Sequence, residues 1–125
     1  TVKNAAEAVA CIPDGATIMV GGFGESGRPN TLLKALLERG TRNLPAISNN
    51  AGEGHHGMAA LLLAGQVSKL ICSFPRGDMA AETEKLVRAG KLELEVMPQG
   101  TLAERIRAAG AGIARCARGR CPRYP

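Results

Sequence analysis

Short runs of apolar residues alternate along this chain with segments whose leucines, alanines and methionines recur at helical spacing. Ile18, Met19 and Val20 are three consecutive apolar residues, two of them β-branched, and they predict a buried strand. The same reasoning predicts strands over about 16–20, 43–48, 67–73 and 92–97, and helices over about 5–11, 29–39, 58–64, 79–89 and 101–109.

Capping and breaking residues mark the ends of these elements. Asn4 with Glu7, and Thr101 with Glu104, have the spacing of capping boxes, so a helix is expected to follow Asn4 and Thr101. Pro45 weakens the second strand, which is therefore expected to start late or to lie at an edge of the sheet.

Strand and helix alternate four times with short connections, a pattern that predicts an α/β fold. We expect an open, mostly parallel sheet with helices on both faces. In such sheets ligands bind outside the carboxyl ends of the strands. The loops that should gather there are rich in glycine, asparagine and charge, and they cover residues 21–28, 49–57, 74–78 and 98–100.

Length, charge and hydropathy narrow the class of protein. With 125 residues the chain suits one domain. Its net charge of +5 would suggest nucleic-acid binding, but most of the excess lies in the last twelve residues. Residues 114–125 hold four arginines and no acid, which leaves twelve bases and eleven acids elsewhere. With so few aromatic residues as well, we set nucleic-acid binding aside. No apolar run is long enough for a membrane span, and residues Glu7 and Asp14 interrupt any signal peptide, so a cytoplasmic location is expected.

The cysteines and histidines offer little support for a metal site. Cys11 and Cys72 lie in apolar surroundings and are predicted to be reduced core residues. Cys116 and Cys121 lie in the basic tail, and further ligands at metal-binding spacing are missing nearby. His55 and His56 are adjacent and lack an evident third ligand, so a solvated loop is favoured over a metal site.

The glycine-rich stretch after the first strand is the main candidate for ligand binding. Four glycines in residues 21–27 let the backbone turn and approach a ligand, and Pro29 suits a helix start. Backbone N–H groups in such a loop could hold a phosphate or an acyl oxyanion. The loop also spells G-x-G-x-x-G, but a dinucleotide site needs an acid where this chain has Asn49 and Asn50. A tight turn without a ligand remains an alternative.

Three charged residues in the predicted loops are candidates for chemistry. Glu25 and Glu53 could act as a nucleophile or a base, or could be solvated acids. Arg76 follows the third strand and could pair with a substrate carboxylate, or could be a surface arginine.

Several of these stretches together resemble family I coenzyme A transferases, and in particular the A-type subunit of the 3-oxoacid enzymes. The resemblance begins at Asp14-Gly15 and runs through three apolar residues, Gly-Gly-Phe, Gly27 and Pro29. Residues 48–52 (SNNAG) and 98–107 (PQGTLAERIR) also resemble that family, and the likeness extends over about residues 2–113. Residues 71–76 (ICSFPR) are most similar to the 3-oxoadipate transferases of aromatic-compound breakdown.

The resemblance implies a transferase that moves CoA from succinyl-CoA to a 3-oxo acid, 3-oxoadipate first and acetoacetate next. It implies a glutamyl-CoA thioester whose glutamate lies on the B-type subunit, the second kind of chain in these enzymes. This chain then has no catalytic residue of its own and needs that CoA-transferase partner in a heterodimer or heterotetramer. Coenzyme A is a substrate, and no cofactor or metal is bound permanently. The implied CoA-binding residues are Gly21, Gly22, Phe23, Gly24, Glu25, Ser26 and Gly27, and the implied substrate pocket is Asn49, Asn50, Arg76, Gln99 and Gly100.

The sequence departs from the family after Ile113. The family's chains continue through further strands, whereas residues 114–125 form a basic tail that is expected to be disordered or to result from a frameshift. Without the later strands, an exposed sheet edge and poor stability are expected. The alternatives to a transferase subunit are a non-catalytic CoA- or nucleotide-binding module and an inactive truncated fragment.

Overall fold

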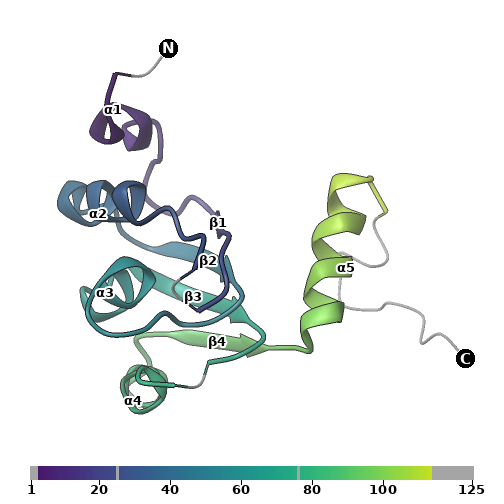
Figure 1. The fold of residues 1–125 in the computed structure, drawn as a ribbon. Helices are drawn as coiled ribbons and strands as arrows, with labels where there is room; N and C mark the ends of the chain where they lie inside the picture. Colours follow the sequence, from purple (N-terminus) through teal and green to yellow (C-terminus); the bar gives the residue numbers. More distant parts are fainter. Residues whose placement is uncertain (1–2, 25, 76, 114–125) are drawn as a thin grey trace, which may run out of the picture.

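The computed structural model describes residues 3–24, 26–75 and 77–113. Within them, four parallel strands form one sheet in the order β1-β2-β3-β4 (Figure 1). The strands are β1 (Ile18–Val20), β2 (Leu44–Ser48), β3 (Val67–Cys72) and β4 (Glu93–Val96). The helices are α1 (Ala5–Val9), α2 (Asn30–Arg39), α3 (Gly57–Leu63), α4 (Ala80–Arg88) and α5 (Gln99–Gly110). The predicted alternation of strand and helix is therefore confirmed.

One face of the sheet carries the core. Ala46 of β2 is in register with Ile18 of β1 and with Leu70 of β3, and Leu70 is in register with Leu94 of β4. Because α2, α3 and α4 each connect two neighbouring parallel strands, all three lie on the same side (Figure 1). The side chains fully enclosed there are mostly leucine, methionine and alanine: Leu44, Ala46, Met58, Ala59, Leu61 and Leu70.

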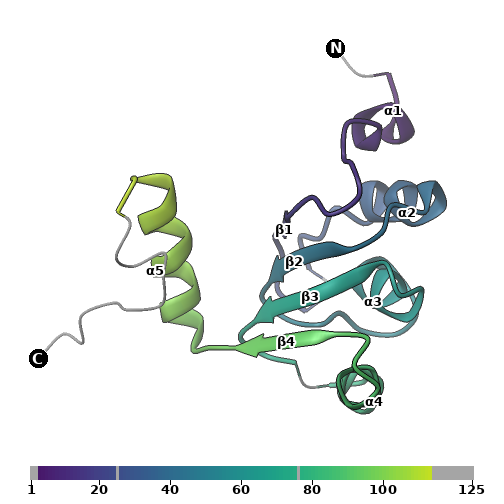
Figure 2. The same ribbon diagram turned by 180° about the vertical axis from the view of Figure 1, so that it is seen from behind.

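Helix α5 lies on the other side of the strands from α2, α3 and α4, as the view from behind shows (Figure 2). Leu102 and Ile106 of α5 share a cavity lining with Met19, Ile47 and Ile71, which alternate along β1, β2 and β3 with the core positions. Helices therefore flank both faces of an open parallel sheet, as predicted. The second face is covered less completely, since Met19 and Ile106 are exposed.

The prediction for Pro45 was half right. The strand does begin at Leu44, but β2 is an interior strand that pairs with β1 and β3, so an edge position is wrong. The register between β2 and β3 shifts between Leu44 and Pro45. That irregularity lies where proline has no N–H to give to a neighbouring strand, and it explains how the residue is accommodated.

Two further expectations need correction. Thr101 does not cap the last helix, because α5 already begins at Gln99 after Pro98, whose φ of −55° suits a helix start. Cys11 is exposed rather than part of the core, since α1 ends at Val9 and Cys11 lies in the turn beyond it. The predicted cap at Asn4 is confirmed by a bond of 2.8 Å from the Glu7 N–H to Asn4 Oδ1.

The core position of Cys72 is confirmed. Its side chain is fully enclosed, and burial raises the pKa of its thiol to about 11. Among the described residues, no helix is long and apolar enough to cross a membrane.

Candidate functional site at the carboxyl ends of the strands

The loops that follow the strands meet at one end of the sheet, as predicted, and Asn49 is at the centre of their contacts. Its backbone carbonyl accepts the N–H groups of Ser73 and Phe74 at 3.1 and 3.0 Å, which joins the loops after β2 and β3. Its side-chain Oδ1 accepts a hydrogen bond of 2.5 Å from Gln99 Nε2, which joins the loop after β2 to the start of α5. Residues from three loops are thus held together by one asparagine.

A cavity of about 300 Å³ opens at this end of the sheet, between β1, β2 and α5. Its polar lining is Gly21, Gly22, Ser48, Asn49 and Gln99, and all of these except Ser48 were predicted from the sequence for different parts of the site. Its apolar lining is Met19, Val20, Ile47, Leu102, Ala103 and Ile106. A small polar group next to apolar walls is the arrangement typical of small-molecule sites.

The glycine loop between β1 and α2 is tightly folded. Phe23 and Ser26 exchange two backbone hydrogen bonds, each of 3.0 Å, and we call this pair the Phe23–Ser26 bridge. The N–H groups of Phe23 and Ser26 are therefore used within the loop. Any anion bound by backbone N–H groups here must rely on other residues of the loop, and Gly21 and Gly22 are the ones that line the cavity.

Gly22 is required by the loop's geometry. Its φ of +110° is one that residues with side chains rarely adopt, and a Cβ atom there would lie 2.7 Å from Arg28 Cγ. It would also lie 2.9 Å from the carbonyl oxygen of Ser26. A side chain at this position would therefore force the loop apart.

The loop after β2 reaches back toward the glycine loop. A Cβ atom on Gly24 would lie 3.5 Å from Glu53 Oε1, so this carboxylate lies next to the glycine loop. Gly52 has a φ of +95°, and a Cβ there would lie 2.7 Å from the backbone nitrogen of Ala59, so the loop packs directly against α3. The structure thus brings Glu53, which the sequence singled out, beside the glycine loop.

Other predicted site residues are placed differently. Asn50 is buried, does not line the cavity, and its Oδ1 has no hydrogen-bond partner among the described residues. Gly100 is exposed in the first turn of α5, and Phe23 is 70% exposed. Glu25 and Arg76 lie outside the described residues.

Sequence reasoning missed two residues of this region. Ser48 lines the cavity at the end of β2, and its buried hydroxyl has no hydrogen-bond partner in the described part of the chain. Arg28 is buried beneath the glycine loop, and its Nε donates to the carbonyl of Gly24. The position of Ser48 at a strand end was a usable signal, whereas an arginine in a polar loop gives no sign of its burial.

The adjacent histidines lie away from this cavity. His55 and His56 are exposed and line a separate groove between α2 and α3 together with Asn30 and Lys34. Among the residues that the structure describes, no group of three His, Cys, Asp or Glu side chains could hold a metal ion. The tail cysteines, Cys116 and Cys121, lie outside those residues.

Charged residues of β3, β4 and α5 form ion pairs at the edge of the sheet opposite β1. Arg105 bonds to Glu95 at 2.7 Å, and Lys69 lies 3.2 Å from Glu95 and 2.7 Å from Glu93. The hydrogen bond from Arg105, aided by Lys69, lowers the pKa of Glu95, and the bonds to Glu93 and Glu95 raise the pKa of Lys69. This network stabilises the β3–β4 side of the fold and lies apart from the glycine loop.

Backbone N–H groups beside two carboxamides and an apolar wall could hold a carbonyl or thioester oxygen next to a flexible apolar chain. The N–H groups and carboxamides are not nucleophiles, and among the described lining residues only Ser48 carries a hydroxyl.

The family model described as coenzyme A transferase matches residues 2–118, and the chain belongs to this family.

Among relatives, the chain is similar to the A-type subunit of the 3-oxoadipate CoA-transferase from Pseudomonas putida, with 58% identity over 113 residues. The match covers 90% of this chain and 49% of that one, so the chain spans about half the length of this relative.

Solved structures have the same fold. A variant of the decarboxylase AibA/AibB matches with a TM-score of 0.73 and 28% identity, over 89% of this chain and 44% of that one. The chain also matches the acyl-CoA transferase YdiF of E. coli O157:H7 in a thioester complex with CoA, with a TM-score of 0.70 and 31% identity. This match covers 87% of this chain and 22% of that one. These likenesses confirm the predicted family and fold.

Proposed function

We propose that this chain supplies the amino-terminal part of the A-type subunit of a 3-oxoacid CoA-transferase, and that the cavity between Gly21, Gly22, Asn49 and Gln99 receives the CoA thioester. The observation that carries the proposal is the convergence of these four residues, predicted separately as CoA-binding and substrate-binding, on one cavity. The 58% identity to the Pseudomonas putida chain supports it.

In the proposed reaction CoA passes from succinyl-CoA to a 3-oxo acid. A glutamate carboxylate on the B-type subunit attacks the thioester carbonyl of succinyl-CoA, which forms a mixed anhydride and releases the CoA thiolate. The thiolate then attacks the glutamyl carbonyl, succinate leaves, and the enzyme holds CoA as a glutamyl thioester. The 3-oxo acid takes CoA by the same steps in reverse, which frees the glutamate. This chain's part is to bind and orient. Gly21, Gly22 and Gln99 line the cavity, and their N–H groups are the donors that we assign to the thioester oxygen. The apolar wall beside them would exclude water.

We take 3-oxoadipate as the preferred acceptor and acetoacetate as the next. 3-Oxoadipate has a second carboxylate, which a cation at Arg76 could bind through two parallel hydrogen bonds. In a complete transferase, Arg76→Ala should then lower kcat/KM for 3-oxoadipate by about tenfold or more and leave that for acetoacetate nearly unchanged. An unchanged ratio of the two would exclude this role. Aromatic catabolism, a cytoplasmic location and assembly with a B-type partner chain follow from the same proposal and stay predictions.

Isothermal titration of the chain with CoA, and separately with NADH, tests the proposal. Binding of CoA, strengthened when a B-type chain is added, is expected, and NADH should not bind. Binding of NADH without binding of CoA would contradict the proposal and favour a dinucleotide site. Binding of CoA that is indifferent to the B-type chain would favour a non-catalytic CoA-binding module.

A further inference from the structure

Arg28 is a buried cation at the end of the glycine loop. Its side chain is only 8% exposed, although arginine is rarely buried unless hydrogen bonds offset the loss of water. Its Nε donates to the backbone carbonyl of Gly24. The carbonyl that receives this bond lies between the two residues of the Phe23–Ser26 bridge.

The aliphatic part of the same side chain packs against the start of the glycine loop, at Gly22. A Cβ on Gly22 would lie 2.7 Å from Arg28 Cγ, so the stem of Arg28 lies directly against the Gly22 backbone. Gly22 lines the cavity, and Gly24 follows Phe23 of the bridge. One side chain therefore contacts the loop both where it faces the cavity and where it turns back.

We propose that Arg28 is a positioning residue that keeps the Phe23–Ser26 bridge closed and thereby directs the N–H groups of Gly21 and Gly22 into the cavity. Its effect on CoA binding rests on the proposed function. A loop held in its binding conformation loses less entropy when a ligand arrives, so fixing the loop raises affinity without any contact between Arg28 and the ligand.

The test compares two substitutions of Arg28 with one of Arg39. Arg28→Met keeps most of the stem and removes the donor, and Arg28→Lys keeps a cationic donor of different shape. Arg39→Met is the matched control, because Arg39 also donates a side-chain N–H to a backbone carbonyl, that of Val9 between α2 and α1. Urea unfolding of each variant reports global stability separately.

Amide hydrogen exchange of Phe23 and Ser26, followed by NMR in the free chain, decides the proposal. Arg28→Met should speed exchange at both amides by about tenfold and weaken CoA binding by a similar factor, since the lost bond involves a charged donor. Arg28→Lys should recover part of both, and Arg39→Met should change neither. Wild-type exchange at both amides in Arg28→Met would overturn the proposal. Failure of the unaltered chain to bind CoA would instead count against the proposed function.

Discussion

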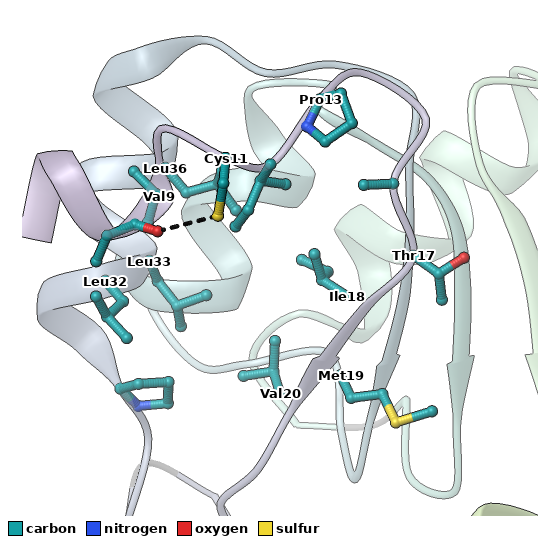
Figure 3. Close-up of a pocket in the computed structure, with 14 residues that line it drawn as sticks. Val9, Cys11, Pro13, Thr17, Ile18, Met19, Val20, Leu32, Leu33 and Leu36 are labelled. Carbon is teal, nitrogen blue, oxygen red and sulfur yellow. Dashed lines mark hydrogen bonds between the residues drawn. The ribbon is translucent and has the colours of Figure 1, made fainter. Parts of the chain in front are cut away.

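The two edges of the sheet differ in chemistry. At β4, Glu93 and Glu95 are paired with Lys69 and Arg105, so the outer strand carries charges on its surface. At β1 the strand is Ile18–Val20 without any charge, and Met19 is 61% exposed. An apolar groove of about 390 Å³ runs between β1 and the helices α1 and α2 (Figure 3).

The outer strand β4 carries the charges typical of a sheet edge, whereas the outer strand β1 has the apolar sequence typical of a strand inside a sheet. Charged side chains on an outer strand discourage pairing with other strands, as at β4. A run of apolar residues is typical of strands inside a parallel sheet, yet in the described residues β1 pairs with β2 alone. The glycine loop and the candidate cavity both follow β1. The candidate site thus lies on the side of the sheet whose outer strand carries no charge.

The largest expected effect is on the loop that follows β1. Gly22→Ala places a Cβ against Arg28 and the Ser26 carbonyl at a φ of +110°, so we expect loss of CoA binding and about 1–3 kcal/mol of destabilisation. Calorimetric titration and urea unfolding measure the two effects. Gly110→Ala is the control, because a Cβ there meets nothing within 4 Å and the residue is helical. Equal results for both variants would mean that the loop is not as tight as described.

A matched pair of lysines compares the edges directly. Met19→Lys puts a charge on the apolar edge, whereas Val96→Lys puts one on the edge that is already charged; Val96 is 53% exposed. We expect the apolar edge at β1 to promote self-association of the chain. Met19→Lys should reduce this association in sedimentation velocity, and Val96→Lys should leave it nearly unchanged. Both should alter the free energy of unfolding by about 0.5 kcal/mol or less. The same change in association from both variants would contradict the difference between the edges.

The charged edge should show in the pH dependence of stability. The pKa of Glu95 is lowered by Arg105 and Lys69, so its contribution is present above about 4.5, its ordinary value, and is lost as the pH falls through the lowered pKa. Because the carboxylate is partly exposed, we expect Glu95→Gln to remove about 0.5 kcal/mol near neutral pH and nothing in strong acid. Urea unfolding across this range measures it. A loss that persists unchanged in strong acid would show that packing, and not charge, is responsible.

The last prediction concerns the reaction of two thiols with iodoacetamide, which should differ between Cys11 and Cys72. Cys11 is exposed and lines the groove beside β1, whereas Cys72 is enclosed in β3 and the pKa of its thiol is raised to about 11. Iodoacetamide at about pH 8 should modify Cys11 and spare Cys72 in the folded chain, as read by mass spectrometry of peptides. Modification of both at one rate would mean that the core opens readily.

The sequence predicted most of the fold because local signals and the global pattern agree. Ile18–Val20, the glycine loop and the leucines of α2 each specify one element, and short connections imply a parallel sheet. One error arose where a distant contact decides the outcome, and the other arose at a helix end. Pro45 is accommodated in an interior strand by a register shift, and Cys11 is exposed because α1 ends two residues before it.

The candidate site was predicted in part for the same reason. Gly21, Gly22, Asn49 and Gln99 follow strands, and the carboxyl ends of parallel strands necessarily meet. The burial of Arg28 could not be predicted, since it depends on how a neighbouring glycine leaves room for the arginine stem. The polar pairing of Asn49 with Gln99, fifty residues apart, likewise depends on the position of α5.

The most direct test of the central claim is an NMR titration of the isotope-labelled chain with CoA. We predict shifts at the backbone amides of Gly21 and Gly22 and at the side-chain amides of Asn49 and Gln99, with the His55–His56 groove unaffected. Saturable shifts confined to that groove, or to the apolar groove beside β1, would show that CoA binds away from the cavity where the loops converge, contrary to this prediction.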